Sequence, residues 1–115
     1  MSKRSPKLLI EDMLDCISKI DRYCSGKIFE DIVNDSMLID AIVRNLSVIG
    51  EAANRVPKSL QLQHQEIYWS EIIGLRNRIV HDYFGLDYEL IWEIINNDLP
   101  QLQNSLERIL VSFEN

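Results

Sequence analysis

The chain has 115 residues and a net charge of −6, and 46% of its residues are hydrophobic. A chain of this length can bury a core as one domain, residues 1–115, without disulfide or metal support. The acidic balance argues against a general nucleic-acid binder, which normally has a basic surface. No apolar run approaches the roughly 18 residues of a membrane span, and the basic N-terminus lacks the apolar core of a signal peptide, so we expect a cytoplasmic protein without membrane association.

Three helices are predicted in the first half of the chain. Ser5 reads as an N-cap with proline after it, and apolar residues then recur at helical spacing, which predicts a helix to about Tyr23. Ser25-Gly26 ends this helix, and residues 27–33 are apolar enough for a short second one. The cap cluster at 34–36 begins a third helix, at about 37–56.

The third predicted helix has an apolar side and an ordered polar side. The polar side carries a stripe of residues spaced three, four or seven apart: Asp40, Arg44, Ser47, Glu51 and Arg55. One interpretation is a solvated face with ordinary surface ion pairs, which contribute little each. The other depends on the small residues beside Glu51, which would let a second helix approach and make Glu51 the carboxylate partner of an arginine.

The second half of the chain predicts a connection and two further helices. Residues 59–65 are polar and read as a connection after Pro57. A fourth helix is expected from residue 66 or 69 to residue 82 or 83, and Gly85 ends this helix. A fifth spans about 88–113 with Asp87 as its N-cap, and Pro100 should bend it near Asn96 or Asn97. The fold is therefore predicted to be all-α, an up-and-down bundle of four or five helices.

Arg76 is the unusual residue of the fourth predicted helix. On a regular helix it lies in the middle of an apolar stripe, whose other members are Trp69, Ile72, Ile73, Ile79, Val80 and Tyr83. A guanidinium there needs a carboxylate, carbonyl oxygens or an anionic ligand. Asn77 and His81 are four residues apart and would face the same object.

The spacing Arg76-x4-His81-x-Tyr83, together with Asn77, resembles the signature of the HepT toxins, a branch of the HEPN ribonucleases. Its surroundings also resemble the family pattern: Ile49-Gly50-Glu51-Ala52, Trp69, Phe84-Gly85, Ile91-Trp92 and Asp98-Leu99-Pro100. The resemblance runs from about Leu8 to Leu110, nearly the whole chain. It implies a HEPN-type bundle.

The resemblance implies a metal-independent endoribonuclease that cleaves RNA through the ribose 2′-hydroxyl. His81 can transfer protons near neutral pH, and the fork of Arg76 suits a phosphate. Asn77 could orient the imidazole or a substrate oxygen, with Glu51 and Arg44 as supporting residues. One chain supplies a single set of these catalytic groups, whereas the reaction needs two proton-transfer groups. The resemblance implies that the second set comes from a partner, because HEPN proteins form twofold homodimers that bring two Arg-x4-His sets into one cleft.

Residues 44–81, which include these site residues, carry five basic residues against three acidic ones, a net charge of +2, and the remainder carries −8. A local basic cleft on an acidic body can bind RNA briefly, with strong salt dependence. We expect no DNA ligand.

No metal or other cofactor is expected. The two histidines are 17 residues apart, and Cys16 and Cys24 are eight apart without a Cys-x2-Cys pairing, so neither pair has a recognised ligand spacing. We expect both cysteines to be reduced packing residues. His64, in the polar connection, reads as a solvated loop residue.

The resemblance also implies a partner and a modification. HepT toxins belong to type VII toxin–antitoxin systems, in which an MNT-type nucleotidyltransferase antitoxin adds AMP units to the motif tyrosine, here Tyr83. The phosphodiester would then compete with RNA for Arg76.

Alternatives remain open at this stage. The bundle could be a non-catalytic docking or nucleotide-binding partner of a nucleotidyltransferase, or a purely structural helical dimer, although the last leaves Arg76 unexplained. His81 could instead stabilise a helix C-terminus, and Tyr83 could be a core aromatic residue.

Overall fold

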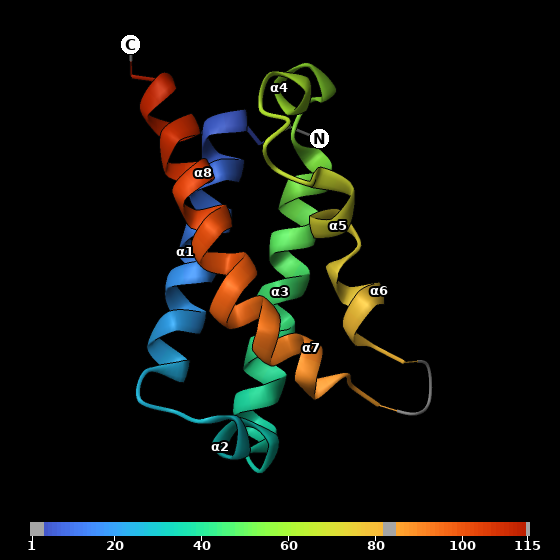
Figure 1. Ribbon diagram of the computed structural model, residues 1–115. Coiled ribbons are helices and arrows are strands. Elements are labelled where there is room, and N and C mark those ends of the chain that lie inside the picture. Colours follow the sequence, from blue (N-terminus) through green and yellow to red (C-terminus); the bar gives the residue numbers. More distant parts are fainter. Residues whose placement is uncertain (1–3, 82–84, 115) are drawn as a thin grey trace.

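The computed structural model describes residues 4–81 and 85–114, and within them the all-α prediction is confirmed (Figure 1). Tyr83 lies outside the described residues. The elements in chain order are α1 (Pro6–Cys24), α2 (Phe29–Val33), α3 (Ser36–Arg55), α4 (Lys58–Gln63), α5 (Trp69–Ile73), α6 (Leu75–Ile79), α7 (Tyr88–Glu93), the π-helical turn η2 (Ile94–Asp98) and α8 (Leu99–Ser112). No described helix is long and apolar enough to cross a membrane.

The first and third predicted helices form almost as expected. The Ser5 hydroxyl accepts a hydrogen bond from the Leu8 N–H at 3.2 Å and so caps α1. Asp35 caps α3 in the same way, through the Leu38 N–H at 3.1 Å. Both helices bury one apolar face, and α3 lies between α1 and the pair α5–α6, so it joins these two parts of the bundle (Figure 1).

The connection expected at 59–65 is wrong, because residues 58–63 form α4. The Leu60 and Gln61 N–H groups both donate to the Pro57 carbonyl at 3.0 Å, which closes the first turn. The Gln61 side chain is buried and donates to the carbonyls of Ala53 and Val56, at 3.3 and 3.0 Å. A polar side chain therefore satisfies the end of α3, and polar composition alone did not reveal that role.

The single fourth helix is also corrected, because α5 and α6 meet at Gly74. This residue has φ −88° and ψ 12°, and it serves as the C-cap of α5 and the N-cap of α6. Helix α6 then ends at Ile79, and the extended Val80 forms an isolated antiparallel bridge with Leu86. His81 consequently follows the helix and lies in the returning loop.

The last predicted helix is interrupted where the bend was expected. Pro100 has no N–H to donate to the carbonyl of Asn96, four residues earlier. The chain takes a wider turn there, and the Leu99 N–H donates to the Ile94 carbonyl, five residues back. Beyond this turn α8 continues with a buried face of Leu99, Leu102, Leu106 and Ile109 that packs on α1.

Candidate active site

A groove separates α3 from α5 and α6 and holds Arg76. It has a volume of about 220 Å³, and its lining residues are Ser47, Gly50, Glu51, Asn54, Ile73, Arg76 and Asn77. Three of the predicted site residues therefore come together: Glu51 from α3, and Arg76 and Asn77 from α6.

Gly50 explains why the two helices can lie so close. A Cβ atom at this position would lie 3.0 Å from the carbonyl oxygen of Ile72 and 3.2 Å from that of Ile73, and both neighbours are backbone. Ala52 and Ala53 are buried beside it. The expectation that small residues next to Glu51 allow a second helix to approach is therefore confirmed.

The environment predicted for Arg76 is wrong, because its side chain is exposed. The break at Gly74 changes the helical phase, and the buried face of α6 is formed by Leu75 and Ile79. Arg76 and Asn77 occupy the open side. A solvated guanidinium needs no buried counterion, so it is available to an anion that enters the groove.

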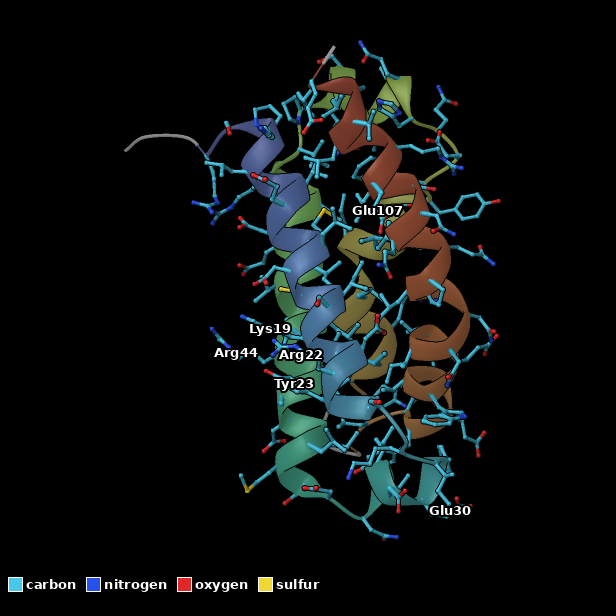
Figure 2. The ribbon with its side chains drawn as sticks, turned by 90° about the vertical axis from the view of Figure 1, so that its left-hand side faces the viewer. Lys19, Arg22, Tyr23, Glu30, Arg44 and Glu107 are labelled. Carbon is cyan, nitrogen blue, oxygen red and sulfur yellow. The ribbon has the colours of Figure 1, made fainter. Side chains whose placement is uncertain are left out.

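Glu51 and Arg44 have different surroundings. Glu51 lines the Arg76 groove, but among the ion pairs of the described residues none joins it to Arg76. Arg44 lines a separate groove of about 290 Å³ between α1 and α3. Lys19 and Tyr23 of α1 line the same groove, and their side chains are labelled with that of Arg44 in Figure 2.

His81 follows α6 and is held by a backbone hydrogen bond to Gly85. Its N–H donates to the Gly85 carbonyl at 2.8 Å, and Gly85 has φ +95°, a conformation that favours glycine. The imidazole is exposed, and its Nε2 lies 3.7 Å from Oδ2 of Asp87. The shared helical stripe predicted for His81 and Asn77 is wrong, because His81 is not on the helix.

Asp87 is a site residue that the sequence analysis assigned only to helix capping. Its Oδ1 accepts a hydrogen bond from the Leu90 N–H at 3.0 Å, and its own N–H donates to the Ile79 carbonyl at 2.8 Å. The other carboxylate oxygen faces His81, where it can orient the imidazole. The only signal in the sequence was an acidic residue six positions after the histidine, and its approach depends on the bridge between Val80 and Leu86.

Other charged and polar groups lie on the opposite side of α5 and α6. Arg78 Nη2 is 4.0 Å from Asp98 Oδ2 in a groove of about 230 Å³ beside α8, and burial raises the pKa of Asp98.

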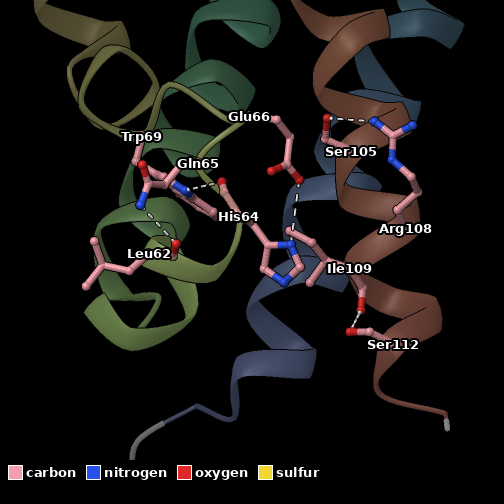
Figure 3. A network of polar contacts seen from close by, with 9 residues as sticks. All are labelled: Leu62, His64, Gln65, Glu66, Trp69, Ser105, Arg108, Ile109 and Ser112. Atoms are coloured by element: carbon pink, nitrogen blue, oxygen red, sulfur yellow. Dashed lines mark hydrogen bonds and ion pairs between the residues drawn. The ribbon is translucent and has the colours of Figure 1, made fainter.

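His64 is half-buried rather than solvated. Its Nδ1 lies 3.6 Å from Oε1 of Glu66, and its backbone carbonyl accepts a hydrogen bond from Trp69 Nε1 at 3.0 Å (Figure 3). His64 lines neither the groove beside α8 nor the Arg76 groove.

Cys16 and Cys24 are free thiols, and burial raises the pKa of each. Within residues 4–81 and 85–114, no group of three or more His, Cys, Asp or Glu side chains is arranged to hold a metal ion.

The fold is an all-α bundle of HEPN type, and the Arg-x4-His spacing lies on α6 and the loop after it. The chain belongs to the HepT-like ribonuclease family, because the family model described as Ribonuclease HepT-like matches residues 13–109.

Relatives from several organisms extend along nearly the whole chain. A protein of Caldanaerobacter subterraneus named as a candidate RNase is 39% identical over 108 residues, which cover 93% of this chain and 96% of the relative. A probable ribonuclease HepT of Thermococcus cleftensis is 34% identical and covers 93% and 97%. A candidate RNase of Methanocaldococcus jannaschii is 32% identical and covers 99% and 94%. No solved structure is significantly similar to the chain.

Proposed function

We propose that this chain is a metal-independent endoribonuclease and the toxin of a type VII toxin–antitoxin pair. The observation that carries the proposal is the family match, whose Arg-x4-His spacing falls here on two exposed side chains, Arg76 and His81. RNA is the substrate, and we expect no DNA substrate. The free thiols of Cys16 and Cys24 are typical of a reducing compartment, and the proposal therefore places the activity in the cytoplasm.

The proposed reaction is an internal transfer at phosphorus. The ribose 2′-oxygen attacks the adjacent phosphorus as its proton passes to an imidazole. The bond from phosphorus to the 5′-oxygen breaks, and that oxygen takes a proton from a second imidazole. The products are a 2′,3′-cyclic phosphate and a 5′-hydroxyl. Arg76 stabilises the charge on the phosphoryl oxygens, and Asp87 orients His81.

Two imidazoles are needed because one histidine cannot act as base and acid in the same step. His64 is no substitute, because it lines neither the Arg76 groove nor the groove beside Arg78. The proposal therefore includes a homodimer in which each copy contributes one His81 to a shared cleft. Asn77, Glu51 and Arg44 would support the bound RNA or the position of Arg76.

Regulation by an MNT-type nucleotidyltransferase antitoxin completes the proposal. Transfer of AMP from ATP to the Tyr83 hydroxyl forms a phosphodiester and releases pyrophosphate. The tethered anion and purine would then occupy the region that RNA uses, because Tyr83 follows His81 by two residues.

Cleavage of RNA in EDTA tests the catalytic proposal. We expect the wild-type protein to release fragments with 2′,3′-cyclic phosphate ends. Arg76→Ala and His81→Ala should each lose about 2–4 kcal/mol of transition-state stabilisation, roughly 30-fold to 10³-fold in rate. Lys7→Ala, which removes an exposed cation from α1, serves as the matched control.

Two results would contradict the assignment. Cleavage at the wild-type rate by either site variant would exclude that residue from catalysis. A wild-type protein that binds its nucleotidyltransferase or a nucleotide but cuts no RNA would instead support a non-catalytic docking or nucleotide-binding role, in which the open Arg76 groove holds a nucleotide phosphate.

A further inference from the structure

The outward face of α3 is covered by no other described helix. Helix α3 packs on α1 at one flank and on α5 and α6 at the other. Between these flanks lies a stripe within about 100° of the helix circumference. It consists of the exposed residues Asp40, Arg44, Glu51 and Arg55 and the half-buried Ser47 and Val48.

The four charges on this stripe have no ion-pair partner among the described residues. Along the chain their signs are negative, positive, negative and positive. Their positions are symmetric about the point between Ser47 and Val48, so that Asp40 mirrors Arg55 and Arg44 mirrors Glu51. Each residue thus mirrors a residue of opposite charge. An isologous interface has this requirement, because the same patch must complement itself when one copy is reversed.

We propose that α3 packs antiparallel on α3 of a second copy, about a twofold axis that passes between Ser47 and Val48. Arg44 then faces the partner's Glu51, and Asp40 faces the partner's Arg55. The serine and valine at the centre are small enough for close approach. A parallel pair would place every charge opposite its own copy and would be repelled. This interface rests on the homodimer of the proposed function and supplies its register.

The arrangement has a direct consequence for the active site. The twofold axis lies in the plane of the interface and is perpendicular to α3. Rotation about this axis reverses the direction of α3 but leaves each flank of the helix on the same side of the dimer. The α5–α6 flank of one copy therefore meets the α5–α6 flank of the other. The Arg76 groove is lined by Ser47, Gly50, Glu51 and Asn54 of α3, so it lies next to the axis. Both Arg76 side chains are thus directed to one cleft.

Charge reversal tests the register directly. Arg44→Glu alone and Glu51→Arg alone each place like charges opposite one another in both symmetric contacts. We expect each to weaken the dimer by about 100-fold or more in sedimentation at micromolar concentration. An equimolar mixture of the two variants should dimerise again, because every contact between them joins opposite charges. The double variant R44E/E51R should also dimerise.

The controls are Lys7→Glu and Glu11→Lys, which reverse exposed charges on α1 away from the stripe and should remain dimeric. Recovery on mixing shows that the single variants are folded. If the single variants stay dimeric, or if mixing restores nothing, this register is overturned while a homodimer through another surface survives. A monomeric wild-type protein would overturn the homodimer itself. Neither result depends on RNA cleavage, so each is distinct from a failure of the ribonuclease assignment.

Discussion

At the scale of single residues, the position of Arg76 determines what the groove can bind. A buried arginine would have been committed to a protein carboxylate, whereas the exposed Arg76 retains its donors for a phosphate. The apolar residues around it in the sequence suggested burial because a continuous helix was assumed. The assumption does not hold, because the helix is broken at Gly74. The identities of Arg76 and His81 could be found from their spacing, but their exposure depends on tertiary structure.

Tyr83 provides a prediction at the same scale. Co-expression with the cognate nucleotidyltransferase should add AMP to Tyr83, detected by mass spectrometry of proteolytic peptides, and should silence RNA cleavage. A tethered phosphodiester has an effective concentration in the millimolar range, about the level needed to displace weakly held RNA. Tyr83→Phe should therefore keep its activity in the presence of the enzyme.

Tyr88 is the internal control for this modification, because it lies beyond Gly85 at the start of α7. Adducts found only on Tyr88, or silencing of Tyr83→Phe by AMP transfer, would refute the proposed regulation.

At the scale of elements, sequence periodicity located α1, α3 and the short α2, but it missed α4 and joined α5 and α6 into one helix. The caps Ser5, Asp35 and Asp87 all work as local sequence rules predict. The missed helix α4 depends on a buried glutamine, and the break at Gly74 depends on how α5 and α6 pack on α3. Both are tertiary effects, and a pattern read along one segment does not contain them. The interruption before Pro100 could be predicted from the sequence, because the hydrogen bond that proline removes lies within its own helix.

The contact between α3 and α5 predicts the effect of Gly50→Ala. Alanine in a helix normally gains about 0.5–1 kcal/mol over glycine, but here the new Cβ would press on two backbone carbonyls that cannot rotate away. Such overpacking costs about 1–3 kcal/mol, so we expect a net loss of roughly 1 kcal/mol in the free energy of unfolding.

Urea unfolding measures this change, with Asn54→Ala as a control on the same helix. Asn54 is exposed in the same groove, and its replacement should stabilise α3 by a few tenths of a kcal/mol, about the difference in helix propensity. A Gly50→Ala protein as stable as the wild type would show that α5 is not held at this distance.

At the scale of the whole molecule, the proposed mechanism needs two copies for one cleavage event. An excess of His81→Ala should therefore suppress wild-type cleavage, because a mixed dimer has only one His81 imidazole in the shared cleft. With a tenfold excess of the variant, nearly all wild-type chains would be in mixed dimers, and we expect about a tenfold loss of rate or more. The rate of RNA cleavage in EDTA measures the effect.

The same variant carrying Arg44→Glu should suppress less, because it associates weakly with wild-type chains. Wild-type activity that is simply diluted by His81→Ala, in proportion to its share of the mixture, would mean that each chain works alone.

The shortness of α5 and α6 has a consequence for how the protein moves. Each has five residues, and α6 carries both Arg76 and Asn77. A helix of about one turn does not form by itself, because nucleation consumes more conformational entropy than so few hydrogen bonds return. These segments are helical only while they pack on α3. The α5–α6 arm should therefore exchange its amide hydrogens faster than α1, α3 and α8, and it can open locally while the rest of the bundle stays closed. The part of the chain that would meet RNA is thus also the part that can adapt its shape to a ligand at the lowest energetic cost.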